Sequence, residues 1–231
     1  MTRILKSSMF VAALLCSAAP LLAQDKTGLN VDISATGQPG GVAQFDMAQA
    51  LFALGVAQKD ALLALTAAKL AAGVQMTDVE RDGVRTPPNA GADDAPDGVT
   101  RPADAALMLD IARRFAAEDE TLLGLVQTAE AQSQYGEISG AQRQLNTLPP
   151  GAVDLWTVPF YGRSLAEIGV KGNGDTPLVV AITDENDNRI TCPARVDDRF
   201  YCDFMPLWNG YFRISVSNAG PVVNSYYLLT N

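Results

Sequence analysis

The sequence of 231 residues contains no histidine. Serine and cysteine triads that use histidine, histidine zinc sites and haem ligation by histidine are therefore excluded. The chain also lacks a G-x-S-x-G elbow, a P-loop and a dinucleotide-binding fingerprint, and the mature chain has no S-x-x-K spacing. We therefore expect no catalytic residues and no cofactor, and we predict that the protein is not an enzyme.

Basic residues are also scarce. Lys and Arg together number 17 against 26 Asp and Glu, which gives a formal net charge of −9. A protein that binds nucleic acid or an acidic lipid surface needs a positive patch to attract phosphate groups. The charge therefore predicts that neither is a partner.

The most apolar run lies near the start of the chain. Arg3 and Lys6 precede an apolar run over residues 9–15, and small residues follow, which is typical of a secretory signal peptide. The run is too short to span a bilayer, and nothing later approaches 18 consecutive apolar residues. We expect a signal peptide over residues 1–23, cleaved after Ala23, with no membrane insertion afterwards. Loss of two basic and no acidic residues changes the net charge from −9 to −11, and the mature protein is predicted to be periplasmic or secreted.

Three cysteines become two when the signal peptide is removed. Cys192 and Cys202 then form an even pair in an oxidising compartment, and their separation fits a bridge between adjacent strands of a hairpin or across a wide loop. A two-thiolate metal site is the alternative, but it would need further ligands and the mature chain offers neither histidine nor a third cysteine. The sequence favours a disulfide.

The first half of the mature chain has helical periodicity. Residues 24–41 are polar and contain Gly and Pro, which predicts an extended lead-in. Residues 42–132 are predicted to form a helical domain of hairpins with about four helices, in which Asp60 caps the second helix and Pro102 opens the third. Residues 76–101 are rich in Pro, Gly and Asp, which predicts a mobile loop. A calcium loop is the alternative there, although the regular alternation of ligands is missing.

The helical hairpins form a faint repeat. Segments 60–65 and 120–125 align at an offset of 60 residues. Alanine-rich hairpins resemble tetratricopeptide-type repeats, which bind partner peptides in a groove, but the diagnostic aromatic and proline positions are missing here. A four-helix core is the plainer interpretation.

The second half of the chain has strand periodicity. Turn-forming residues cluster in 133–151, which predicts a linker. Residues 152–231 then alternate short apolar runs with turn signals, which predicts an antiparallel β-sandwich of jelly-roll type. The fold class expected is α+β with two domains. The strands are expected at 155–161, 165–170, 178–183, 189–192, 200–205, 211–217 and 222–229.

Several motifs in the strand region match a known bacterial family in their order. They are Gly172 to Thr176 before a strand, Asp184 to Asn188 after it, and Trp208 to Tyr211 followed by Asn218, Tyr226 and Tyr227. Residues 153–231 thus resemble the pre-peptidase C-terminal domains, small jelly-roll sandwiches appended to secreted proteins. The resemblance implies an accessory module that aids secretion, solubility or attachment. An alanine-rich helical region followed by such a sandwich also looks like an arrangement found in uncharacterised exported bacterial proteins.

Oxygen-bearing side chains at predicted strand ends raise the question of calcium. Asp175, Asp184, Asn186 and Asp187 are the candidates, because carboxylate and amide oxygens suit this ion. Related sequences carry acidic residues near Leu178, where this chain has Pro177 and Val179. Side chains of this type also form turns without metal by bonding their own backbone, and the sequence favours that interpretation.

Aromatic residues make up only 7% of the sequence, yet many of them lie in the predicted sandwich. Trp156, Trp208 and Tyr211 are candidates for stacking on a sugar ring. The alternative is that such residues fill the core of the sandwich and cover its ends.

Taken together, the residues favour a non-catalytic exported protein that acts by interaction or as an accessory of the bacterial envelope or exterior. Its expected partner is a protein or a cell-surface polysaccharide. The alternative is a carbohydrate-active hydrolase that uses an Asp/Glu pair, because that chemistry needs only carboxylates. No sequence rule selects a pair.

Overall fold

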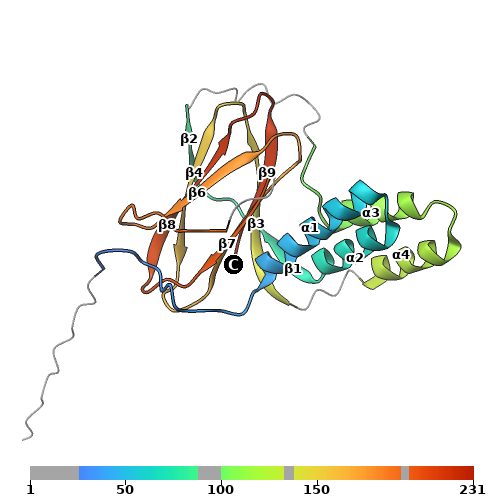
Figure 1. Cartoon of the computed structure of the whole chain (residues 1–231), viewed down its shortest axis with the longest axis horizontal. Coiled ribbons are helices and arrows are strands. Elements are labelled where there is room, and N and C mark those ends of the chain that lie inside the picture. Colours follow the sequence, from blue (N-terminus) through green and yellow to red (C-terminus); the bar gives the residue numbers. More distant parts are fainter. Residues whose placement is uncertain (1–25, 88–99, 133–137, 194–197) are drawn as a thin grey trace, which may run out of the picture.

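The computed structural model describes residues 26–87, 100–132, 138–193 and 198–231, so the predicted signal peptide lies outside the described residues. The described residues form a mixed α+β fold with four helices and two largely antiparallel sheets (Figure 1). The helices are α1 (Gly41–Gln58), α2 (Ala61–Ala72), α3 (Ala105–Ala116) and α4 (Glu120–Gln132). The strands are β1 (Val74–Asp78), β2 (Gly83–Thr86), β3 (Ile138–Leu148), β4 (Val153–Phe160), β5 (Ala166–Gly172), β6 (Leu178–Thr183), β7 (Arg199–Phe204), β8 (Gly210–Asn218) and β9 (Asn224–Thr230).

Aspartate side chains define the start of two helices. Asp60 accepts a hydrogen bond from the backbone N of Leu63 at 3.0 Å, which confirms the predicted cap of α2. Asp104 caps α3 in the same way. Helix α3 therefore begins at Ala105 and not at Pro102, because the capping carboxylate determines where the first turn closes.

The strands form a five-stranded sheet, sheet A, in the order β1-β3-β9-β5-β7, and a four-stranded sheet, sheet B, in the order β2-β4-β8-β6. Neighbouring strands pair antiparallel except β1 and β3, which are parallel. Strands β1 and β2 lie within residues 76–101 or at their edge, where a mobile loop was expected, and β3 lies within the expected linker 133–151. Strands β1, β2 and β3 form because each pairs with a neighbouring strand of a sheet, and such pairing overrides a polar, turn-like composition. Residues 88–99 and 133–137 of the two expected segments lie outside the described residues.

Two hydrophobic clusters cover the two opposite faces of sheet A. Successive side chains of a strand point to opposite faces. In β9, Tyr226 and Leu228 belong to the cluster that sheet A shares with sheet B, whereas Tyr227 and Leu229 belong to the cluster shared with the helices. Every residue of β9 is buried as a result, and the helices lie on the side of sheet A away from sheet B (Figure 1).

The expected strand over residues 189–192 is reduced to a single bridge between Thr183 and Arg189. The chain turns back after β6, and Ile190 donates its backbone N–H to the carbonyl oxygen of Ile182 at 2.9 Å. Pro193 then follows, and because proline has no N–H the ladder cannot continue through it.

The lead-in over residues 26–40 carries no helix or strand, and it is attached to the sheets by side-chain hydrogen bonds. Asn30 is fully buried, and its amide exchanges hydrogen bonds with the backbone of Trp208 at 3.0 and 3.1 Å. The backbone N of Asp32 donates to the carbonyl oxygen of Met205 at 2.8 Å. The lead-in is therefore part of the folded structure.

Candidate binding sites

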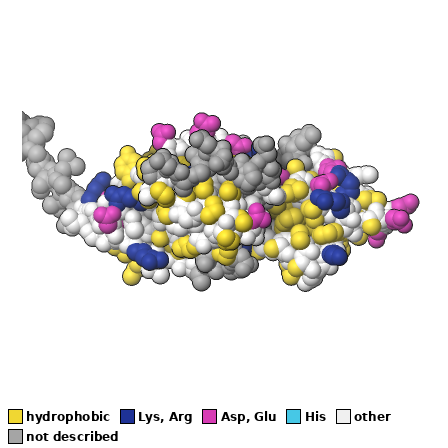
Figure 2. All heavy atoms as spheres, turned by 90° about the horizontal axis from the view of Figure 1, so that it is seen from above, with side chains coloured by type: hydrophobic (Ala, Val, Ile, Leu, Met, Phe, Trp, Pro, Cys, Tyr) yellow, Lys and Arg dark blue, Asp and Glu magenta, His cyan; other side chains and the backbone are white. Residues whose placement is uncertain are grey.

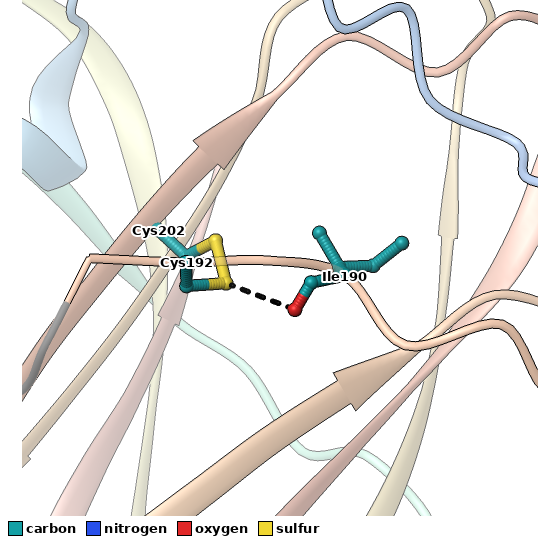
Figure 3. Close-up of a disulfide and its surroundings, with 3 residues drawn as sticks. All are labelled: Ile190, Cys192 and Cys202. Carbon is teal, nitrogen blue, oxygen red and sulfur yellow. Dashed lines mark hydrogen bonds between the residues drawn. A yellow bond between two sulfur atoms is a disulfide. The ribbon is translucent and has the colours of Figure 1, made fainter.

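Cys192 and Cys202 form the predicted disulfide (Figure 3), with a Cα–Cα distance of 5.3 Å. Cys202 is buried in β7, whereas Cys192 lies after the bridge that follows β6. Strands β6 and β7 belong to different sheets, so the bond does not join two neighbouring strands of a hairpin. The disulfide attaches the segment that connects β6 of sheet B with β7 of sheet A to β7 itself, which is the edge strand of sheet A. The sulfur of Cys192 also lies 3.8 Å from the carbonyl oxygen of Ile190, a contact without a proton because a bridged sulfur carries none.

The four calcium candidates do not converge. Asp175 precedes β6 and the other three follow it, and a strand of six residues is about 20 Å long. Asp187 forms an ion pair with Arg213, and Asn186 donates its amide to the carbonyl oxygens of Lys26 and Gly28. Within the described ranges no group of three His, Cys, Asp or Glu side chains is placed to hold a metal ion.

Asp184 organises the turn after β6. Its carboxylate is fully buried and accepts hydrogen bonds from the backbone N of Asn30, Asn186 and Asn188 at 2.8 to 2.9 Å. Burial opposes ionisation, but these hydrogen bonds and the amide of Asn188 outweigh it and hold the pKa of Asp184 below its ordinary value. The side chain therefore acts here as a turn former.

Two of the three candidate stacking residues are core residues. Trp156 is 5% exposed and donates its Nε1–H to the hydroxyl of Tyr226 at 2.8 Å. Trp208 is 6% exposed and donates its Nε1–H to Glu185 at 2.6 Å. Neither ring presents a face to a ligand.

Tyr211, the third candidate, is 60% exposed and lies beside a small surface pocket. Tyr161, which is 76% exposed, lines the same pocket of about 220 Å³. In the ladder of β4 and β8, Pro159 lies directly opposite Tyr211 and Phe160 opposite Gly210. Because Phe160 is buried, the alternation of the strand places Pro159 and Tyr211 together on the outer face of sheet B.

A cavity of about 1010 Å³ lies beside β1 and β3, near the start of α3. Arg143 forms an ion pair with Asp78 and lies over the ring of Tyr227, 4.9 Å from its centroid. Hydrogen bonds from Arg143 hold the pKa of Asp78 below its ordinary value. The cavity contains four acidic and three basic side chains, so its lining favours neither sign of charge in a ligand.

The buried acidic side chains of the described residues are each engaged in the fold. Asp154 pairs with Arg85 and accepts the hydroxyl proton of Tyr226 at 2.8 Å. Burial, followed by the charge of Asp154, raises the pKa of Tyr226, which keeps its hydroxyl a donor. Asp198 pairs with Lys171 at 2.5 Å. These carboxylates therefore have structural partners within the fold.

Glu167 of β5 supplies the N-terminal cap that α1 lacks locally. Helix α1 begins after Gly40, which has no capping side chain. The Oε1 of Glu167 accepts hydrogen bonds from the backbone N of Gly40 at 2.9 Å and of Ala43 at 3.2 Å, and from the hydroxyl of Tyr201 at 2.9 Å. Burial and the charge of Glu167 raise the pKa of Tyr201. This carboxylate joins the helices to sheet A.

No protein-family model matches the chain, and the curated proteins contain no match either. The similarity to pre-peptidase C-terminal domains therefore rests on the sequence motifs alone.

The sequence places Tyr161 among the aromatic residues of the predicted sandwich but does not single it out, and it does not indicate the charged cavity or Glu167. The alternation of β4 was a usable signal for Tyr161, because Val158 and Phe160 occupy inward positions and the residues between and after them point outward. Glu167 had no local signal, since its partners at residues 40 and 43 are far away in the sequence.

Proposed function

We propose that this protein is a non-catalytic, exported interaction or accessory protein of the bacterial envelope or exterior. In this proposal the helices bind a partner protein, and the two sheets form a jelly-roll-like β-sandwich that serves as a stable accessory module. The observation that carries the proposal is an uncovered apolar surface on the helices.

The apolar surface consists of large side chains that face solvent on α1 and α2. Met47 is 61% exposed, Leu54 is 46% exposed and Leu62 is 50% exposed. Met47 and Leu54 are seven residues apart in α1, so they share one face of the helix. Figure 2 shows hydrophobic side chains gathered over the helical part of the molecule. Clustered exposed side chains of this kind mark protein interaction sites more often than isolated ones do.

The charge distribution on α1 supports a protein partner. Its one charged side chain, Asp46, forms an ion pair with Arg199 of β7 and so belongs to the contact with sheet A. The face that holds Met47 and Leu54 carries no charged side chain of its own, and the core of a protein interface is likewise depleted of charge and enriched in Met.

The accessory role of the sheets is supported by their shared core and by the disulfide. One hydrophobic cluster includes side chains from both sheets, and the disulfide fixes the crossover between them. Disulfides persist in oxidising compartments, in keeping with export. The described helices include none that is both long and apolar enough to cross a membrane.

The absence of catalysis is tested by incubating the purified chain with a broad panel of glycosides and peptides. We expect no turnover, because the buried carboxylates are engaged in structural contacts. Turnover that disappears on replacement of a single Asp or Glu would establish the hydrolase alternative instead.

The interaction surface is tested with a photo-crosslinking residue placed at Met47 and, as a control, at exposed Thr128 of α4. In extracts of the cells that carry the gene, we expect one discrete crosslinked protein at Met47 and none at the control position. Equal products at both positions, or none at Met47, would contradict the proposed surface. A product of twice the chain mass would identify a second copy of this chain as the partner.

A further inference from the structure

The pocket between Tyr161 and Tyr211 is open, uncharged and lined mainly by rings. Its walls come from Pro159, Phe160, Tyr161, Asn209, Gly210 and Tyr211. The lining contains no acidic or basic side chain, unlike that of the large cavity beside β1. A ligand that fits this lining is neutral and offers an apolar face together with hydrogen-bonding groups.

Ring contacts and backbone hydrogen bonds hold the walls of the pocket in place. Phe160, at its base, makes edge contacts with Phe204 and Phe212 at centroid distances of 6.0 and 5.8 Å. The chain after Tyr161 is fixed by two hydrogen bonds, from Gly162 N to Asn209 Oδ1 at 2.8 Å and from Arg163 N to the carbonyl oxygen of Pro206 at 2.7 Å. Preformed sites lose little conformational entropy on binding, and this favours affinity.

Close packing explains the glycine beside Tyr161. A Cβ on Gly162 would lie 2.5 Å from the Cα of Trp208, so a side chain cannot be accommodated without a shift of backbone. The backbone that carries Tyr161 therefore packs directly on the segment that carries Asn209.

The polar groups at the pocket are suited to hydroxyl groups. The hydroxyls of Tyr161 and Tyr211 and the Nδ2 of Asn209 have no hydrogen-bond partner among the described residues. Asn209 Oδ1 is engaged by Gly162, so its Nδ2 is a donor in a fixed position. Two ring faces with a few fixed polar groups are complementary to a pyranose, which has an apolar C–H face and a rim of hydroxyls.

We infer that the Tyr161–Tyr211 pocket binds one sugar ring of a neutral polysaccharide. The volume of 220 Å³ is below the range of roughly 300–1,000 Å³ found for pockets that enclose a whole drug-sized ligand. An open pocket of this size holds one unit of a chain whose other units remain in solvent. The net charge of −9 disfavours acidic polysaccharides.

A protein ligand fits these features less well. A stable protein interface buries about 800 Å² on each partner, whereas the aromatic surface here is confined to one end of the two central strands of sheet B, where β4 ends and β8 begins. The site is also on a different element from the apolar surface of α1 and α2, so the inference does not depend on the proposed protein partner.

The test measures binding of the whole mature, oxidised chain to soluble polysaccharides by affinity electrophoresis, with isothermal titration of an oligosaccharide from any polysaccharide that is bound. The neutral probes are β-glucan, xylan, mannan and pullulan, and the acidic probes are alginate and polygalacturonate. We expect retardation by at least one neutral polysaccharide and by neither acidic one. The variants Tyr161→Ala and Tyr211→Ala should each weaken binding about tenfold, through loss of a stacking face.

Two controls separate loss of the ring from loss of the fold. Tyr211→Phe keeps the ring and should retain most of the affinity, whereas Leu155→Ala removes an exposed apolar side chain from the same strand as Pro159 and should leave binding unchanged. All variants should melt at the temperature of the unmodified chain, because the altered side chains are exposed. Binding that survives both alanine variants, binding to the acidic probes alone, or no binding to any neutral probe would each overturn the inference.

Discussion

The carboxylate of Asp184 holds together two segments of the chain that are far apart in sequence. It accepts hydrogen bonds from Asn30 in the lead-in and from Asn186 and Asn188 in the turn after β6. The side chain was predicted either to bind calcium or to form a turn. In the structure the oxygens of this carboxylate face backbone N–H donors, as they do in a turn former.

The lowered pKa of Asp184 makes its contribution to stability depend on pH. Since the pKa is lower in the folded than in the unfolded state, the stabilisation is complete above the unfolded value of about 3.9 and is lost as the pH falls through the folded value. We expect Asp184→Ala to lower the free energy of unfolding by about 1–3 kcal/mol at pH 7, since buried N–H donors lose their acceptor. Urea denaturation should show that this difference shrinks below about pH 4.

The matched control for Asp184 is Asp175→Ala, which removes an exposed carboxylate bonded to Asn173 in the turn before β6. It should change the free energy of unfolding by less than about 0.5 kcal/mol. A difference for Asp184→Ala that stays constant from pH 7 to pH 2 would mean that its charged form has no special role.

The disulfide should be complete and stabilising in the mature protein. Free-thiol titration of the denatured, unreduced chain should give essentially no signal, and two reactive thiols per chain would contradict the bond. Replacing both Cys192 and Cys202 by serine should lower the free energy of unfolding by roughly 2–5 kcal/mol in urea denaturation. Unmodified protein under reducing conditions provides the comparison, since its free energy of unfolding should fall by the same amount as that of the double variant.

Among the elements, α1 depends on tertiary structure more than the other helices do. Its start is capped by Glu167 from β5, and a Cβ on Gly40 would lie 2.4 Å from the Oε2 of that carboxylate. The sequence predicted α1 from its apolar periodicity, but the cap could not be predicted because the carboxylate reaches the helix only after sheet A has formed.

We expect Glu167→Ala to weaken the attachment of the helices to sheet A. Two backbone N–H groups and the hydroxyl of Tyr201 would lose a charged acceptor, which costs about 1.5–3 kcal/mol for one such bond and more for the set. Measured by hydrogen exchange, the substitution should speed the exchange of the α1 amides more than that of the β8 amides. Tyr201→Phe removes one of the three bonds and should have a smaller effect, and equal effects would argue against capping as the main role.

The strands of the second half of the chain were predictable, and those from the first half were not. Six of the predicted runs correspond to β4 through β9 within a few residues, because their apolar residues alternate and turn formers separate them. Strand β3 is polar and contains Gly140, and β1 and β2 are short. Each of them therefore becomes a strand only by pairing with a neighbouring strand of its sheet. The pocket at Tyr161 and Tyr211 depends on the β4–β8 register, which periodicity alone does not specify.

For the whole molecule, sheet A joins the helices and sheet B through its two faces. The sequence predicts that a helical unit and a strand unit separate at residues 133–151, but in the structure this segment contains a strand of sheet A. Strand β3 pairs with β9 over seven residue positions, and Leu148 at its end lies in the cluster shared with sheet B. Removal of residues before 152 would expose one edge of β9 and uncover the face that holds Tyr227.

We therefore expect a fragment of residues 152–231 to lack a cooperative thermal transition, whereas the mature chain should unfold in a single transition. Circular dichroism of both proteins under oxidising conditions measures this directly. A fragment that starts at residue 138, and so retains β3, is the control and should recover β structure. A cooperative transition in the 152–231 fragment would restore the two separable units that the sequence predicts.

The position of β9 in sheet A also has a consequence for the order of folding. Both neighbours of β9, the strands β3 and β5, precede it along the chain, and they do not pair with each other. Until residues 224–230 have been synthesised, sheet A consists of two separate halves, β1 with β3 and β5 with β7. Joining them requires contacts that are distant in sequence, which fold slowly. Sheet A can therefore be completed only when almost the whole chain has been made, so β9 acts as the closing strand of the fold.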